Sequence, residues 1–242
     1  MISAIDRLRT AVMTPLRDLL AGLDSALASG PVALLWIGVG LLVGWWVYVP
    51  VHELAHAFGC LAAGGSVTRL DIDPLYGAAL LREVFPFVHL GSEYAGRLSG
   101  FDPRGSDLVY LATDLAPFLL TLFPGVWWLR RSGRARRPLL FGASLPWALA
   151  PFLSLTGDAY EIGSLASVHL PPARGARELV GDDLFRQAAE LDLAADPVLA
   201  WGFAVAILLG LLWAFTWYWL GGMIARFLGE PPPAEAAVAA SR

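Results

Sequence analysis

Residues 52–56 read His-Glu-Leu-Ala-His, which places two histidines four positions apart. Residues at this spacing share one face of a helix, so both imidazoles can reach a single zinc ion. Glu53 is rotated by about 100° from His52 on such a helix and stands beside the metal without ligating it. There it can take a proton from a water and pass it to a leaving amine. We expect Zn²⁺ held by His52 and His56, with Glu53 as general base.

The motif lies inside a long apolar segment. Residues 34–49 contain no charged side chain, and the segment extends over 31–63. A helix needs about 20 mostly apolar residues to cross a bilayer, so this segment predicts a membrane-spanning helix, with a kink at Pro50. Each ionisable group inside such a helix costs about 3 kcal/mol unless it is paired or ligated. This cost favours metal binding over a chance occurrence of the motif.

The composition also indicates a membrane protein. Of 242 residues 57% are hydrophobic, and the mean hydropathy is +0.59, more apolar than a water-soluble core requires. Further apolar segments of spanning length occupy 108–129, 139–165 and 197–227. We expect an all-α polytopic protein with about four transmembrane helices, integral to a bacterial-type plasma membrane. The net charge of -4 and the lack of a basic face exclude nucleic acid as a partner.

Shorter segments complete the predicted organisation. Residues 1–30 have apolar side chains at helical spacing, which predicts an amphipathic helix at the membrane surface; a plain linker helix is the alternative. Residues 67–80 alternate partly between apolar and polar, and turn residues follow, so we expect a small β-hairpin at the membrane edge. The charged connection over 167–196 is expected to be partly helical. The proline- and alanine-rich residues 230–242 are expected to be disordered.

These features together resemble the site-2 protease family of intramembrane zinc proteases. The resemblance rests on the HExxH motif in the first core span, the continuation Ala-Ala-Gly-Gly-Ser-Val at 62–67, the strand-like stretch at 70–80 and a later span with an acidic residue. It covers about 31–165. In that family an aspartate in a later core helix, within a Leu-Asp-Gly motif, is the third zinc ligand. That role falls here on Asp158, which glycine precedes instead of following.

The resemblance implies a zinc endopeptidase that hydrolyses transmembrane or membrane-proximal segments of protein substrates. A substrate segment, unwound locally, would pair with the strand edge of the hairpin at 67–80. The alternative function is a non-proteolytic metal-binding membrane protein that acts as a binding or scaffold module, which the altered aspartate motif favours. Glu53 argues against this alternative, because a site that only binds has no need of a general base.

Two other carboxylates are alternatives to Asp158. Glu161 lies three residues later on the same helical face and is either the runner-up ligand or a partner that orients an imidazole. Asp114, within the second apolar segment, replaces Asp158 if the helices pack differently. Its other interpretation is a hydrogen bond between helices near Thr113.

The predicted organisation has four parts, and its membrane orientation is open. The parts are an N-terminal helix at 1–30, a three-helix zinc protease core at 31–165, a charged connection with the fourth span at 166–229, and the tail at 230–242. A loop at 130–137 holds five arginines, which places it in the cytoplasm and the HExxH end of the first span outside. The proteases that the chain resembles keep zinc toward the cytoplasmic side, so the two indications disagree.

Overall fold

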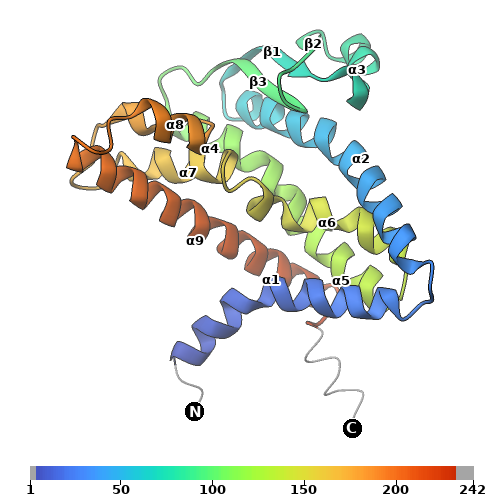
Figure 1. Cartoon of the computed structure of the whole chain (residues 1–242). Coiled ribbons are helices and arrows are strands. Elements are labelled where there is room, and N and C mark those ends of the chain that lie inside the picture. The colour runs from blue at the N-terminus through green and yellow to red at the C-terminus, as the bar shows by residue number, and fades with distance from the viewer. Residues whose placement is uncertain (1–3, 233–242) are drawn as a thin grey trace. The chain divides into compact units, whose positions relative to one another are not determined.

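The computed structural model describes residues 4–232, and within them helices predominate beside one small sheet (Figure 1). Four helical segments among these residues are long and apolar enough to cross a membrane, namely Ala33–Ala62, Asp107–Arg134, Pro138–Ser167 and Pro197–Phe227. The prediction of four long apolar helices is therefore confirmed. Of the tail predicted at 230–242, residues 233–242 lie outside the described residues.

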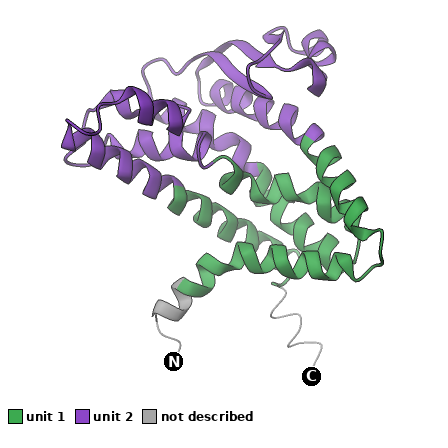
Figure 2. Ribbon diagram, in the orientation of Figure 1, with its two compact units in different colours: residues 1–45, 120–154, 211–242 green, residues 46–119, 155–210 purple. Residues whose placement is uncertain are grey.

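The chain forms two compact units, each assembled from separate stretches (Figure 2). Unit 1 comprises Met1–Trp45, Leu120–Ser154 and Leu211–Arg242, and unit 2 comprises Trp46–Leu119 and Leu155–Gly210. The helices α2 (Ala33–Ala62) and α9 (Pro197–Phe227) contribute to both units. Helix α2 continues through Pro50, and the kink expected there stays a prediction.

Unit 1 is a bundle of apolar helices. Besides its parts of α2 and α9, it contains α1 (Ala4–Leu27), η3 (Thr121–Gly125), α5 (Val126–Arg134) and α6 (Pro138–Leu153). Val126, Leu129 and Phe141 are buried in its core. A Cβ placed on Gly40 or Gly142 would overlap the backbone of the facing helix, so these glycines let α2 and α6 pack closely.

Helix α1 confirms the helical part of the prediction for residues 1–30. Val12, Leu16 and Leu20 are exposed at a spacing of four and so share one face, whereas Asp18 and Ala26 are buried. The location of this helix at a membrane surface stays a prediction.

The predicted arginine loop at 130–137 is wrong for its first part, because α5 extends to Arg134. Arg130 is buried, and its Nε donates to Asp18 Oδ2 at 2.8 Å. Its Nη1 donates to the carbonyl oxygen of Gly222 at 3.1 Å, and the Tyr218 hydroxyl donates to Asp18 Oδ2 at 2.9 Å. Since the charge of Arg130 is compensated inside the protein, this residue carries no weight in the orientation argument.

Unit 2 combines helices with the sheet. Besides its parts of α2 and α9, it contains β1 (Ser66–Ile72), η1 (Pro74–Tyr76), α3 (Ala78–Val84), β2 (Val88–Leu90), β3 (Gly96–Asp102), α4 (Asp107–Leu115), η2 (Ala116–Phe118), α7 (Asp158–Ser167), η4 (Arg177–Leu179) and α8 (Leu184–Glu190). The strand order is β2-β1-β3, with β1 parallel to β2 and antiparallel to β3. Leu70, Ile72 and Val88 pack with Ala57 of α2. The helical segments within 167–196 confirm that this connection is partly helical.

The predicted hairpin at 67–80 is wrong. Strand β1 accounts for its first half, but the chain then enters η1 and α3 instead of returning as a second strand. The Asp73 carboxylate accepts a hydrogen bond from the Leu75 amide at 2.8 Å, Pro74 begins η1, and Gly77 turns the chain at φ 79°. The turn residues therefore cap a helix. Because β1 is the central strand, the edges of the sheet belong to β2 and β3.

Candidate metal centre

Three side chains from two helices of unit 2 converge: His52 and His56 of α2, and Asp158 at the start of α7. Their ligand atoms all lie within 4.8 Å of one another. The two Nε2 atoms are 3.2 Å apart, His52 Nε2 is 3.0 Å from Asp158 Oδ2, and His56 Nε2 is 3.7 Å from Asp158 Oδ1. Ligand atoms of a tetrahedral zinc site lie about 3.3 Å apart. The structure thus brings together the donors that the sequence predicted, at separations that fit a zinc ion.

The second nitrogen of each imidazole has its own partner. His56 Nδ1 lies 3.0 Å from the carbonyl oxygen of Thr113, and His52 Nδ1 lies 2.7 Å from the hydroxyl of Tyr48. A carbonyl oxygen only accepts, so His56 carries a proton on Nδ1. The neutral ring then presents the lone pair of Nε2 to the convergence point, and the Tyr48 oxygen can hold His52 in the same tautomer. Metal-binding histidines are held in this way.

Local backbone structure explains how these groups come together. Tyr48, His52 and His56 follow one another at intervals of four residues, so α2 stacks them on one face. Gly157 has φ -120° and ψ -117°, which breaks the helix after α6 and starts α7 at Asp158. Asp158 is therefore the first residue of α7, and the helix dipole favours a carboxylate at this end of a helix.

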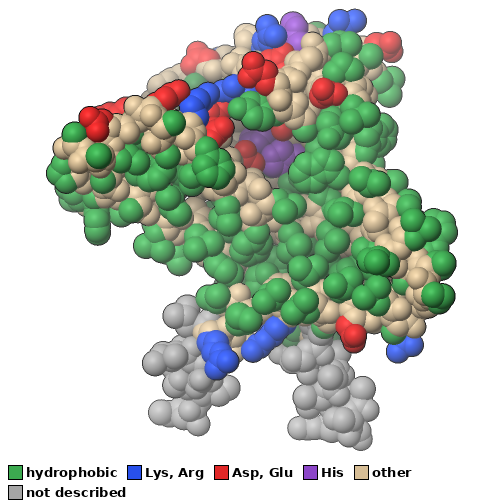
Figure 3. All heavy atoms as spheres, viewed as in Figure 1, with side chains coloured by type: hydrophobic (Ala, Val, Ile, Leu, Met, Phe, Trp, Pro, Cys, Tyr) green, Lys and Arg blue, Asp and Glu red, His purple; other side chains and the backbone are tan. Residues whose placement is uncertain are grey.

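The site is partly accessible. His56 is buried, whereas the side chains of His52 and Asp158 are 12% and 21% exposed. On the face drawn in Figure 3, histidine and acidic side chains are visible among predominantly hydrophobic ones. A water molecule can therefore approach the two exposed donors.

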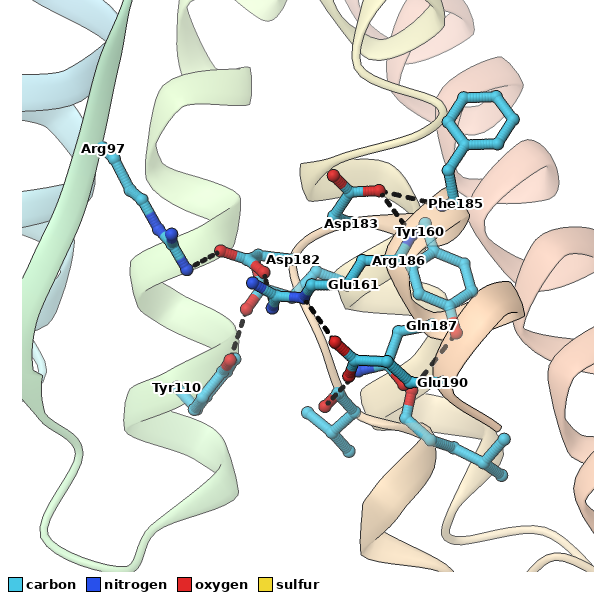
Figure 4. Close-up of polar contacts among 12 residues, drawn as sticks. Arg97, Tyr110, Tyr160, Glu161, Asp182, Asp183, Phe185, Arg186, Gln187 and Glu190 are labelled. Carbon is cyan, nitrogen blue, oxygen red and sulfur yellow. Dashed lines mark hydrogen bonds and ion pairs between the residues drawn. The ribbon is translucent and has the colours of Figure 1, made fainter. Parts of the chain in front are cut away.

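Glu53 lies against the first residue of β3. A Cβ placed on Gly96 would overlap the side-chain carbons of Glu53, so only a glycine allows this approach. The next residue, Arg97, pairs with Asp182 at 2.6 Å, and Asp182 also accepts from Arg186 at 2.7 Å (Figure 4). These ion pairs connect the start of β3 to the segment that precedes α8. They help to keep β3 over Glu53.

The two alternative carboxylates lie outside the converging group. Glu161 accepts a hydrogen bond from the Tyr110 hydroxyl of α4 (Figure 4). Asp114 is buried in α4, and its Oδ2 has no hydrogen-bond partner among the described residues. Asp158 is therefore the carboxylate that the structure brings to the two histidines.

Three contributors to this site were missed in the sequence. Tyr48 has a signal, because it stands four residues before His52 on the same helical face. Thr113 contributes a main-chain carbonyl oxygen, which any residue would supply, so its side-chain type carries no signal. Gly96 depends on the path of β3, which the incorrect hairpin prediction did not include.

A scan against protein-family models and searches of curated proteins and of solved structures find no match to this chain. The resemblance to site-2 proteases accordingly rests on the HExxH motif and the other sequence features that carry it.

Proposed function

We propose that this chain is a polytopic membrane zinc endopeptidase of the site-2 protease kind. His52, His56 and Asp158 would hold the zinc ion, and Glu53 would act as general base. The observation that carries the proposal is the convergence of two imidazole Nε2 atoms and a carboxylate, while Tyr48 and Thr113 occupy the opposite ring nitrogens. In the tautomer with the proton on Nδ1, the Nε2 lone pairs and the carboxylate face one another, an arrangement that a cation held between them would stabilise.

Exposed apolar side chains support a location in the bilayer. Leu34, Leu35 and Leu42 of α2 are 66%, 66% and 72% exposed. Extended apolar surface of this kind is rare on soluble monomers. Together with the four helices of spanning length, it favours helices that contact lipid.

The chemistry divides between the metal and the chain. A zinc ion held by His52, His56 and Asp158 would supply a Lewis acid that makes a water molecule acidic enough to attack near neutral pH. The Glu53 carboxylate takes a proton from the attacking water and delivers it to the nitrogen of the leaving amine. Tyr48 and Thr113 keep the two imidazoles in the tautomer and orientation that this arrangement requires.

Strand β3 is the part of the sheet best suited to a substrate. A peptide bond in a helix is shielded, so the segment to be cleaved has to be extended, and an extended segment can pair with an edge strand. Strand β3 is such an edge and begins with Gly96, directly against Glu53. Strand β3 thus replaces residues 67–80 as the proposed substrate-binding edge, because β1 is the central strand and both of its edges already pair with β2 and β3.

The proposal is tested with the purified full chain in liposomes, using a panel of fluorogenic single-span transmembrane peptides. Wild type and Glu53→Gln should bind equal amounts of zinc, because Glu53 is not a ligand. Cleavage should fall by about 10²–10⁴-fold in Glu53→Gln, the usual contribution of a general base. Glu93→Gln, which changes an exposed carboxylate in the same way, serves as the control and should cleave normally.

Two results would contradict the proposal. Cleavage by Glu53→Gln at the wild-type rate would remove the general base. Bound zinc without cleavage of any peptide in the panel would favour the non-proteolytic metal-binding alternative.

A further inference from the structure

The turn from α5 to α6 borders a cavity in unit 1 that is separate from the metal-binding residues. Its volume is about 730 Å³, within the usual range of about 300–1,000 Å³ for small-molecule sites. Its lining combines aromatic and charged side chains, which include Trp127, Trp128, Arg131, Arg134, Arg137 and Glu230. The proposed peptidase activity makes no use of these residues.

The cavity already contains one anionic group. The Glu230 side chain is 6% exposed, and its carboxylate pairs with Arg131 at 3.2 Å and with Arg134. Arg137 is exposed, and within residues 4–232 its guanidinium has no hydrogen-bond or ion-pair partner. Three arginines thus line the cavity against one carboxylate, which leaves excess positive charge. Arg130 adds nothing to this excess, because Asp18 compensates it in the interior.

The aromatic part of the lining suits an apolar group of a bound molecule. The Arg131 guanidinium is 5.6 Å from the centre of the Trp127 ring, and Trp128 packs edge-on against Trp147 at 6.1 Å. Tryptophan and arginine together are typical of the boundary between hydrocarbon and headgroups. Helices α5 and α6 meet at this turn, where two candidate membrane spans end and begin. A ligand with an anionic head and an apolar tail would match both halves of the lining.

We infer that this cavity binds the headgroup phosphate of an anionic phospholipid. Guanidinium groups form paired hydrogen bonds to phosphate oxygens. A set of arginines favours an anionic headgroup over a zwitterionic one, whose own cation partly neutralises its phosphate. The inference rests on α5 and α6 spanning the membrane and is independent of zinc and of proteolysis. The Glu230 carboxylate forms ion pairs with Arg131 and Arg134 and therefore competes with the lipid phosphate for these two guanidinium groups.

Native mass spectrometry tests the inference on the full chain released from phosphatidylcholine nanodiscs that contain phosphatidylglycerol. Wild type should retain phosphatidylglycerol in preference to phosphatidylcholine. Arg137→Gln should lower this retention about fivefold, the effect of one arginine near a lipid surface. Arg136→Gln is the matched control, since it removes the same charge from the neighbouring residue, which does not line the cavity. It should retain the lipid as wild type does.

A second variant tests the role of the carboxylate. Glu230→Gln frees Arg131 and Arg134 and should raise phosphatidylglycerol retention severalfold. Inorganic phosphate at millimolar concentration, added to the same nanodiscs, should not displace the lipid, because it lacks the tail. Displacement by phosphate alone would overturn the lipid assignment, and equal retention in Arg137→Gln and Arg136→Gln would overturn the site. Unchanged thermal unfolding of the two arginine variants shows that each is folded.

Discussion

Both units bury polar side chains among apolar helices, but their two clusters are completed in different ways. In unit 1, the side chains of Arg130 and Asp18 are 2% and 1% exposed and lie 2.8 Å apart. Burial raises the pKa of Asp18, and Arg130 opposes that rise. The hydroxyl of Tyr218 adds a further hydrogen bond. The opposite charges of this cluster neutralise each other.

The cluster in unit 2 lacks such a balance. His52, His56 and Asp158 direct a carboxylate and two imidazole nitrogens to one point, and the opposite ring nitrogen of His56 already has an acceptor partner in Thr113. A cation at that point would complete the cluster. The comparison shows that burial alone does not mark a functional site. The convergence of ligand atoms without a balancing arginine or lysine is what makes the cluster in unit 2 a candidate metal site.

If the cluster in unit 1 is completed by its own charges, removing one of them should have a large effect on stability. Arg130→Met removes the guanidinium that pairs with Asp18 and leaves a buried carboxylate, so the free energy of unfolding should fall by about 3–5 kcal/mol. Unfolding in mild detergent with increasing dodecyl sulfate measures this quantity. Arg131→Met is the control, because Arg131 is exposed and its ion pair with Glu230 is worth at most about 1 kcal/mol. Equal losses in both variants would contradict the structural role of Arg130.

A smaller effect is expected beside the metal-binding residues. Tyr48→Phe removes the hydroxyl that holds His52 Nδ1 and should weaken zinc binding about 10–100-fold, as loss of such a partner usually does. Competition with a fluorescent chelator measures the affinity. Tyr94→Phe, at an exposed position, is the control and should bind zinc as wild type does. Unchanged affinity in Tyr48→Phe would mean that the hydroxyl does not orient the imidazole.

The smallest effect is expected where β3 meets Glu53. Gly96→Ala adds a Cβ that displaces the Glu53 side chain, so peptide cleavage should fall severalfold while zinc content stays constant. Gly38→Ala adds a Cβ where nothing lies within 4 Å and is the matched control. Loss of zinc in Gly96→Ala would show instead that this contact supports the metal-binding residues.

Local properties made much of the fold predictable. The long helices follow from the length and composition of four apolar segments. Length and composition are properties of contiguous residues, so the sequence alone reveals them. The prediction of a hairpin was wrong because the signals at Asp73 and Pro74 fit both a hairpin turn and a helix cap. In addition, β1 pairs with strands that begin 16 or more residues beyond its end, which no local pattern indicates. The burial of Arg130 depends on Asp18, which lies 112 residues earlier. No local pattern links those two residues.

The candidate site was predictable to the same extent. The spacing of His52 and His56 is a local helical property, whereas Asp158 came from the resemblance to a family. The carbonyl oxygen of Thr113 belongs to a different helix, so only the packing of α4 against α2 identifies it. The local pattern therefore predicted the two histidines and the resemblance pointed to the aspartate, but neither identified the groups that contact the opposite ring nitrogens.

Zinc content is the most direct test of the central claim. The purified full chain, washed with a weak chelator and analysed by plasma mass spectrometry, should contain about one zinc ion per chain. His56→Ala should contain almost none, and His89→Ala, which changes an exposed histidine, should match wild type. A wild-type protein that neither contains nor takes up zinc, or a His56→Ala variant that retains it fully, would contradict the account.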